Sequence, residues 1–236
     1  MRLRAAWIIG LLATGALAGC AVDEASAEAS ATIGEERVRF VALGDSYTIG
    51  TAVGEADRWP NQLAARIGEI ELAANLGVNG YTSADLIAEE LPQLDALRPE
   101  LVSLLIGVND VVQGVPDAGY ASNVAIILDD LVDRLPANRI VCVATPDYTR
   151  TPRGAEYGEP VLQSDRIVRI NAILREACEL RGITFVPDVF EISQRAIDDP
   201  GLVADDGLHP SVEQYRQWVE AIAPVVEVLL VASPHG

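Results

Sequence analysis

Short apolar runs alternate with amphipathic stretches along most of the chain. Five runs rich in apolar and β-branched residues predict strands at 38–43, 70–76, 101–106, 140–144 and 183–186. The third and fourth runs are almost wholly apolar, as expected of strands buried on both faces of a sheet. Between the runs, apolar residues recur at helical spacing and predict five helices: from Trp59 to Ile67, 83–94, from Tyr120 to Leu135, from Ile167 to Ala177, and from Tyr215 onward with a kink at Pro224.

This alternation of strands and helices defines the expected fold. It predicts an α/β protein, a three-layer α/β/α sandwich around a five-stranded parallel sheet. Right-handed crossovers favour the flavodoxin-like strand order 2-1-3-4-5. Two long loops, 145–160 and 193–210, follow the fourth and fifth strands. Ligands of such sheets bind beyond the carboxyl ends of the strands, so we expect the functional site at that edge.

The first residues differ in composition from the rest of the chain, and this difference predicts that the protein is exported. Residues 1–19 have a short basic start and an apolar run that falls short of the roughly 20 residues needed to span a bilayer, which indicates a signal peptide. The segment Leu17-Ala18-Gly19-Cys20 resembles the bacterial lipobox, which implies cleavage before Cys20 and a lipid on its sulfur. We therefore expect a cell-envelope lipoprotein with a tether at 20–36 and one domain at 37–236. The alternative is an ordinary signal peptide with a chance cysteine.

Charge and cysteine content narrow the classes of partner. The formal net charge of −18 argues against nucleic acid and against electrostatic adhesion to anionic lipid. Cys142 and Cys178 fall on apolar positions and are expected in the core, and whether they form a disulfide stays open. His209 and His235 are the only histidines, neither has a second histidine nearby, and the cysteines lack zinc spacing. We expect neither a metal nor another cofactor.

Polar residues follow several predicted strands at the point where each ends. Ser46 follows the first strand, Asn79-Gly80 the second, 107–110 the third, and Asp206 and His209 the fifth. A turn residue, a helix cap or a loop histidine would each explain one of these features alone. Their occurrence together at one edge of one sheet instead predicts a nucleophilic site.

The residue types suit acyl transfer. Ser46 supplies a hydroxyl nucleophile, His209 a base to take its proton, and Asp206 a carboxylate to orient the imidazole and stabilise the imidazolium. Such a site also needs donors for the developing oxyanion. The backbone N–H groups of Ser46 and Gly80 and the side-chain amide of Asn109 are the expected donors.

These residues lie in four sequence blocks. The blocks Gly44-Asp45-Ser46-Tyr47-Thr48, Gly80, Gly107-Val108-Asn109-Asp110 and Asp206-Gly207-Leu208-His209-Pro210 resemble those of the SGNH (GDSL-type) hydrolases. The similarity runs from Val38 to the last helix. It implies the roles given above for Ser46, Gly80, Asn109, Asp206 and His209. It also implies ester hydrolysis through an acyl-enzyme. The Gly-x-Ser-x-Gly elbow of other α/β-hydrolases is missing from the sequence.

The resemblance leaves the substrate open. Relatives include lipases, lysophospholipases, thioesterases, arylesterases and carbohydrate deacetylases, so the expected substrate is a lipid, lysophospholipid or small acyl ester, with acetylated envelope carbohydrate as the alternative. A non-catalytic solute-binding lipoprotein is the competing class, and oligomeric state stays open. The nearest aromatic candidates for a carbohydrate platform, each of which would also suit ordinary packing, are Tyr47, Trp59, Tyr81, Tyr148 and Tyr157.

Overall fold

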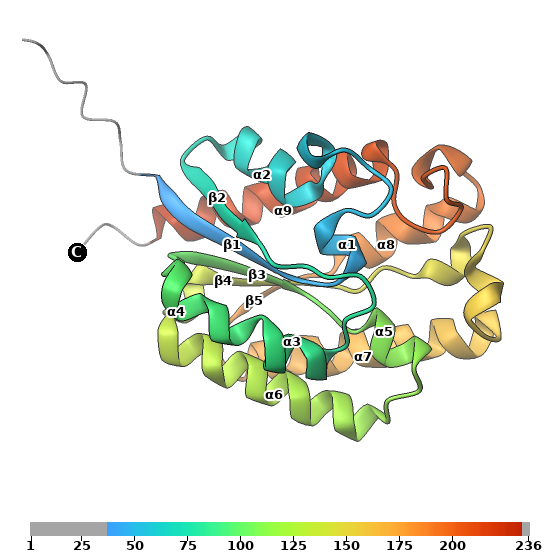
Figure 1. Cartoon of the computed structure of the whole chain (residues 1–236), viewed down its shortest axis with the longest axis horizontal. Helices are drawn as coiled ribbons and strands as arrows, with labels where there is room; N and C mark the ends of the chain where they lie inside the picture. Colours follow the sequence, from blue (N-terminus) through green and yellow to red (C-terminus); the bar gives the residue numbers. More distant parts are fainter. Residues whose placement is uncertain (1–36, 233–236) are drawn as a thin grey trace, which may run out of the picture. The chain divides into compact units, whose positions relative to one another are not determined.

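The computed structural model describes residues 37–232. Its five strands form one parallel sheet in the order β2-β1-β3-β4-β5 (Figure 1). The strands are β1 (Val38–Gly44), β2 (Ile70–Asn75), β3 (Leu101–Leu105), β4 (Ile140–Val143) and β5 (Thr184–Val186). The predicted α/β fold and strand order are confirmed.

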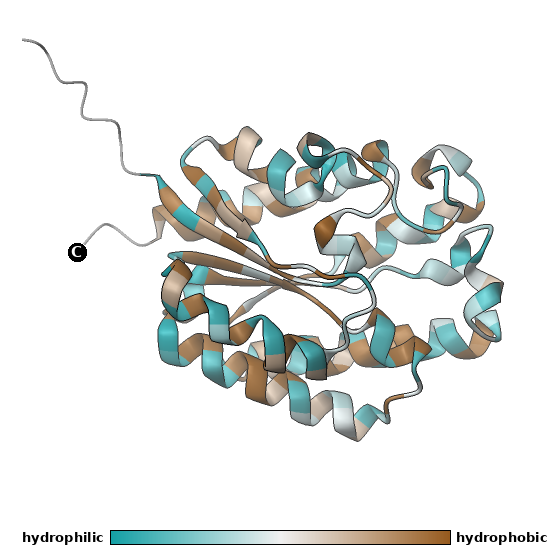
Figure 2. Cartoon of the chain, in the orientation of Figure 1, coloured by the Kyte–Doolittle hydropathy of each residue, from teal (hydrophilic) through white to brown (hydrophobic). Residues whose placement is uncertain are grey.

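Helices cover both faces of this sheet (Figure 1). One face carries α1 (Ser46–Ile49), α2 (Trp59–Ile67), α8 (Asp188–Gln194) and α9 (Val212–Val231). The other carries α3 (Ser83–Glu89), α4 (Leu94–Leu97), α5 (Val108–Val112), α6 (Asp117–Arg134) and α7 (Pro160–Glu179). The strands are largely apolar, whereas the helices mix apolar and polar positions, so each helix packs one face against the sheet (Figure 2).

The core lies on both sides of the central strands. β3 and β4 are buried along their whole length, as their continuous apolar sequence predicts. Trp59 of α2 and Trp218 of α9 are the largest fully buried side chains, and these two helices pack against each other. Cys142 and Cys178 are buried in the core as free thiols.

One predicted helix is wrong in its extent. Instead of running through 83–94, α3 ends at Glu89, a 3-10 turn spans Leu91–Gln93, and α4 begins at Leu94. Pro92 has no N–H to continue an α-helical ladder and disfavours helical backbone in the residue before it. The break turns Glu90 into the protein, where it is fully buried.

Other departures are short elements that have no room for an apolar period. The structure adds α1, α5 and α8, and the loop predicted at 193–210 contains 3-10 turns at Arg195–Ile197 and Pro200–Leu202.

The last helix continues past Pro224 to Val231. Within residues 37–232, no helix has the length and apolarity to cross a membrane. The predicted signal peptide, Cys20 and the tether lie outside the described residues.

Two buried carboxyl groups support the end of β1. Gly44 has φ of 152°, and a Cβ there would lie 2.3 Å from the carbonyl oxygen of Leu105, so only glycine fits. Its N–H donates to Glu90 Oε2 at 2.9 Å. Burial raises the pKa of Glu90 to about 9 despite this bond, and the nearby Asp45 charge adds to the rise. Burial likewise raises the pKa of Asp45 to about 7.

These shifts predict a stability that declines with rising pH. The folded pKa of Glu90 is about 9 against the usual 4.5, so the native state retains a proton that the unfolded chain releases. The stabilisation that Glu90 contributes is complete below the pKa of this group in the unfolded chain, and it is lost as pH rises towards its pKa in the folded protein. In urea titrations at pH 5, 7 and 9, Glu90→Gln should reduce the decline of the unfolding free energy. The exposed neighbour provides the control, because Glu89→Gln should retain the wild-type slope, and equal slopes for all three proteins would refute the assignment.

Candidate active site

Ser46 lies where β1 passes into α1. Asp45 caps the helix by accepting the N–H of Tyr47 on Oδ1 at 3.0 Å, and Ser46 is its first residue, where N–H groups have no partner within a helix. Ser46 lines a cavity of about 220 Å3. Its polar wall comprises Ser46, Asn79, Gly80, Asn109 and His209, and the remaining wall comprises Tyr47, Val108, Val112, Tyr148, Tyr157 and Leu208.

Asp206 and His209 form a bonded pair on the loop before α9. The distance between His209 Nδ1 and Asp206 Oδ2 is 2.6 Å. Asp206 Oδ1 also accepts the backbone N–H groups of Leu208 and His209, each at 2.9 Å. Burial opposes ionisation of Asp206, but these three bonds outweigh it and hold its pKa below the usual 3.8. The charged carboxylate favours a proton on Nδ1, which leaves Nε2 as the acceptor of the imidazole.

Tyr47 packs against this imidazole. The two ring centroids lie 5.7 Å apart with an angle of 62° between the planes, and Tyr47 in turn packs against Trp218 at 6.2 Å. Tyr47 is 4% exposed, so it forms a rigid wall beside the histidine. The sequence places Tyr47 in the first block and among the possible aromatic platforms, but it does not predict a contact with His209. Its position next to Ser46 was the one available signal for this contact.

Gly80 and Asn109 reach the cavity from the segments after β2 and β3, the two strands that flank β1. Gly80 has φ of 82°, in the region that favours glycine. Asn109 Nδ2 donates to the carbonyl oxygen of Tyr81 at 2.9 Å, and Gln113 Nε2 donates to that of Gly80 at 3.2 Å. These bonds join α5 to the loop after β2. An amide has two N–H groups, so Asn109 retains a second donor.

Asp110, the last residue of the third block, has a structural position. Its carboxylate accepts the hydroxyl of Ser83 at 2.5 Å and the N–H of Ser83 at 2.9 Å. Asn123 Nδ2 also donates to Ser83 Oγ at 2.9 Å. Asp110 thus ties the start of α3 to α5, and it is absent from the cavity wall.

The loop after β4 closes one side of the cavity. It contains 3-10 turns at Tyr148–Arg150 and Gly154–Tyr157, and the two tyrosine rings meet edge to face at 6.0 Å. Of the five aromatic candidates from the sequence, three line the cavity: Tyr47, Tyr148 and Tyr157. Trp59 instead lies in the core, and Tyr81 contributes the carbonyl that Asn109 binds.

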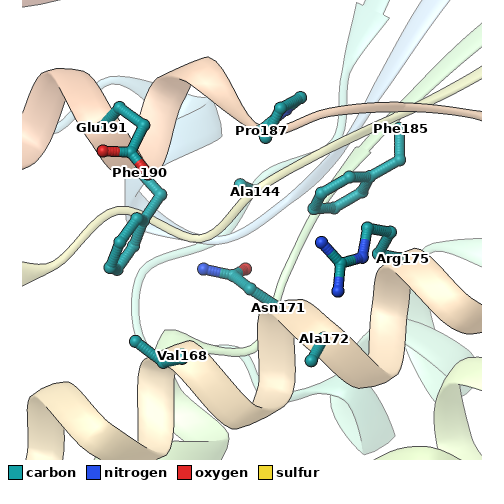
Figure 3. A pocket seen from close by; sticks show the side chains of 9 residues that line it. All are labelled: Ala144, Val168, Asn171, Ala172, Arg175, Phe185, Pro187, Phe190 and Glu191. Carbon is teal, nitrogen blue, oxygen red and sulfur yellow. The ribbon is translucent and has the colours of Figure 1, made fainter.

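A second cavity of about 200 Å3 lies between α7 and α8 beside β5 (Figure 3). Phe185 and Phe190 lie on opposite sides of it, with Asn171 between them (Figure 3). The Asn171 amide is already bonded to the backbone N–H and carbonyl of Thr145, at 2.8 and 2.9 Å. Among the described residues, the wall of this cavity contains no histidine, serine or cysteine, whereas the wall of the first cavity contains Ser46 and His209. No cluster of three possible metal ligands occurs within residues 37–232.

The parallel sheet brings a serine and a carboxylate-bonded histidine to one cavity at its carboxyl edge. This is the organisation of SGNH-type ester hydrolases. This chain belongs to the GDSL-like lipase/acylhydrolase family, whose model matches residues 42–217. It is therefore a hydrolase that acts on ester bonds, as the sequence blocks predict.

Individual relatives agree with this assignment. An arylesterase of Vibrio mimicus is 28% identical over 185 residues, which cover 77% of this chain and 84% of that protein. The structure resembles an acetylxylan esterase from Geobacillus stearothermophilus with a TM-score of 0.63 at 18% identity, covering 80% of this chain and 94% of that one. It also resembles a lipolytic G-D-S-L family protein from Veillonella parvula, with a TM-score of 0.66 at 15% identity and coverage of 80% and 98%. The two structures establish the shared fold.

Proposed function

We propose that the chain is a serine esterase that hydrolyses small carboxylic acyl esters through an acyl-enzyme intermediate. The observation that carries the proposal is the 2.6 Å bond between His209 Nδ1 and Asp206 Oδ2, with Ser46 on the wall of the same cavity. The cavity volume of about 220 Å3 lies below the roughly 300–1,000 Å3 typical of drug-sized ligand sites, which favours small substrates. Similarity to the Vibrio mimicus arylesterase supports hydrolysis of a carboxylic ester.

In the acylation step, Ser46 Oγ attacks the ester carbonyl carbon while His209 Nε2 takes the hydroxyl proton. Asp206 remains ionised and stabilises the imidazolium. The carbonyl oxygen becomes an oxyanion that accepts hydrogen bonds from the N–H groups of Ser46 and Gly80 and from the Asn109 amide. One such donor typically contributes about 10²–10³ in rate. Collapse of the intermediate breaks the bond to the alcohol, which leaves with the proton from His209.

In the deacylation step, water enters the place that the alcohol has left. His209 Nε2 takes a proton from this water as its oxygen attacks the acyl carbon of the ester on Ser46. The second tetrahedral intermediate uses the same oxyanion donors. Its collapse releases the carboxylic acid and returns the proton to Ser46 Oγ, so the enzyme is regenerated without a cofactor.

The direct test is release of p-nitrophenol from the acetate, butyrate and palmitate esters by the wild type, with Ser46→Ala measured in parallel. The proposal expects rapid turnover of the two short esters, slow turnover of palmitate, and none above background in the variant. A protein that binds these esters without hydrolysing them would instead be the solute-binding lipoprotein. Fastest turnover of palmitate would indicate a lipid substrate and refute the preference for small esters.

Deacetylation of envelope carbohydrate by the same machinery is the second candidate. It requires no other catalytic residue, since an acetylated hydroxyl is an ester. Tyr148 and Tyr157 on the cavity wall favour it, as two of the aromatic side chains that the sequence offers for a carbohydrate platform.

The proposal extends to location. The lipobox-like segment ending at Cys20 supports an exported lipoprotein that is held at a membrane by its acyl chains, and two chains suffice for stable anchoring. Metabolic fatty-acid labelling should mark the full chain but not Cys20→Ser. The variant should also move from the membrane to the soluble fraction. An unlabelled wild type would show that Cys20 is not lipidated.

A further inference from the structure

An open groove lies directly beside the catalytic cavity. It has a volume of about 430 Å3, and its wall comprises residues 49–53, residues 77–79 and Arg58. Asn79 lines both the groove and the catalytic cavity, so a substrate that reacts at Ser46 can extend into the groove. Together the two volumes fall within the roughly 300–1,000 Å3 typical of ligand sites, which the catalytic cavity alone does not reach.

The groove carries one unpaired positive charge. Arg58 is the only charged residue of its wall among the described residues. The guanidinium forms no hydrogen bond or ion pair within the described chain, although the protein has 35 acidic residues against 17 basic ones. Other arginines, such as Arg181 and Arg216, each bind a carboxylate. An unpaired cation on the wall of a groove in so acidic a chain indicates an anionic ligand.

The turn after α1 holds the Arg58 side chain in place. Gly50 in this turn has φ of 73°, and a Cβ there would lie 2.4 Å from Arg58 Cγ, so the arginine stem crosses the glycine at close range. Of the three guanidinium nitrogens, only Nε is among the buried atoms without a partner, which leaves the two terminal nitrogens accessible. These nitrogens can donate to both oxygens of one carboxylate. A stem that is already ordered loses little freedom when the ligand binds.

The rest of the groove suits the chain that would carry a carboxylate. Part of its wall is apolar, from Ile49, Val53 and Val78. Thr51 Oγ1 donates to Asn79 Oδ1 at 2.6 Å, which joins the two loops that form the groove. An ester whose reacting end occupies the catalytic cavity can therefore place a short apolar chain past Asn79 and its charged end at Arg58.

We infer that the groove is a carboxylate subsite in which Arg58 determines specificity, so that the preferred substrates are small esters with a carboxylate group remote from the ester bond. The inference rests on the proposed esterase function and refines its substrate. One guanidinium matches the single negative charge of a carboxylate. The carboxylate can belong to the acyl part or to the alcohol, and the test distinguishes these two sources.

The test compares esters that end in a carboxylate with the corresponding terminal carboxamides, which have nearly the same shape and no charge. The acyl series comprises the monomethyl esters of succinic, glutaric and adipic acid. The alcohol series comprises 3-acetoxypropanoate, 4-acetoxybutanoate and 5-acetoxypentanoate.

In at least one series, kcat/KM of the wild type should be about 10-fold higher for the carboxylate than for the amide at the best chain length, as one charge-assisted bond implies. Arg58→Gln should bring this ratio close to one, mainly through a higher KM for the carboxylate. Because the groove is open to solvent, about 0.5 M NaCl should also lower the ratio in the wild type. A merely structural role of Arg58 would lower both esters in proportion and leave the ratio unchanged.

Two further variants separate charge from structure. Arg58→Lys keeps the charge without the guanidinium fork and should retain part of the ratio. Arg66→Gln is the matched control, because Arg66 is an exposed arginine in the last turn of α2 and lines neither the groove nor the catalytic cavity. This control should keep the wild-type ratio. Equal loss of the ratio in Arg58→Gln and Arg66→Gln would show a general effect of net charge and would overturn the role of Arg58.

The remaining outcomes separate this inference from the proposed function. If the wild type hydrolyses the amides as fast as the carboxylates in both series, or if Arg58→Gln keeps the full preference, the subsite is overturned while the esterase function stands. If the wild type hydrolyses none of these esters and no p-nitrophenyl ester, the esterase function fails and the inference fails with it. A preference that Arg58→Gln removes in one series alone supports the subsite and assigns the carboxylate to that part of the ester.

Discussion

Replacement of Ser46 by alanine should lower kcat for p-nitrophenyl acetate by about 10⁴-fold or more, since removing the nucleophile of a serine hydrolase leaves only binding and the oxyanion donors. The melting temperature should change little, because Ser46 is the first residue of a short helix and the alanine keeps its backbone N–H. Initial rates over a range of ester concentrations, together with thermal melts, measure both quantities.

Ser103→Ala provides the control for loss of a buried hydroxyl. Ser103 lies in β3, is fully buried, and has an Oγ without a partner in the described structure, but it does not line the cavity. Its alanine variant should retain wild-type kcat. Activity of Ser46→Ala close to that of Ser103→Ala would mean that another group attacks the ester.

The second large effect concerns the Asp206–His209 pair. His209→Ala should lower kcat by about 10⁴-fold or more, because Ser46 then has no base. Asp206→Ala should cost less, because the imidazole remains and loses only its orientation and the nearby charge. The double variant should be little worse than His209→Ala alone, since residues that act as one unit are strongly non-additive.

A double-mutant cycle on kcat/KM measures this coupling. Losses that simply multiply would mean that Asp206 acts independently of His209, in conflict with the 2.6 Å bond between Nδ1 and Oδ2. The neighbouring Asp205 is the matched control. Asp205→Ala should keep most of the activity, because Asp206 carries the bonds to the His209 ring and backbone.

The sheet was predictable because its signals are strong and largely local. Continuous apolar runs such as 101–106 identify buried strands, and the handedness of crossovers then favours one strand order. The candidate site was predictable for a related reason. Ser46, Asn109 and the Asp206–His209 segment each follow a strand, and parallel strands bring their carboxyl ends to one edge.

The sequence could not supply the side-chain environments that the fold creates. Glu90 falls in the helix predicted at 83–94, where a glutamate is expected at the surface. The break at Pro92 instead turns it inward to the N–H of Gly44. Tyr148 and Trp59 were equal candidates for a ligand platform, but Tyr148 lines the cavity and Trp59 fills the core between α2 and α9. Such differences depend on which face of an element meets which neighbour, and composition and spacing carry little of that information.

Labelling with a fluorophosphonate is the most direct test of the central claim, that Ser46 is a nucleophile activated by His209. The reagent phosphonylates an activated serine, and peptide mass spectrometry locates the adduct. The account predicts one adduct per chain, on Ser46, and a strongly slowed reaction in His209→Ala. An adduct on any other serine, or a Ser46 that stays unmodified while the enzyme hydrolyses p-nitrophenyl acetate, would contradict it.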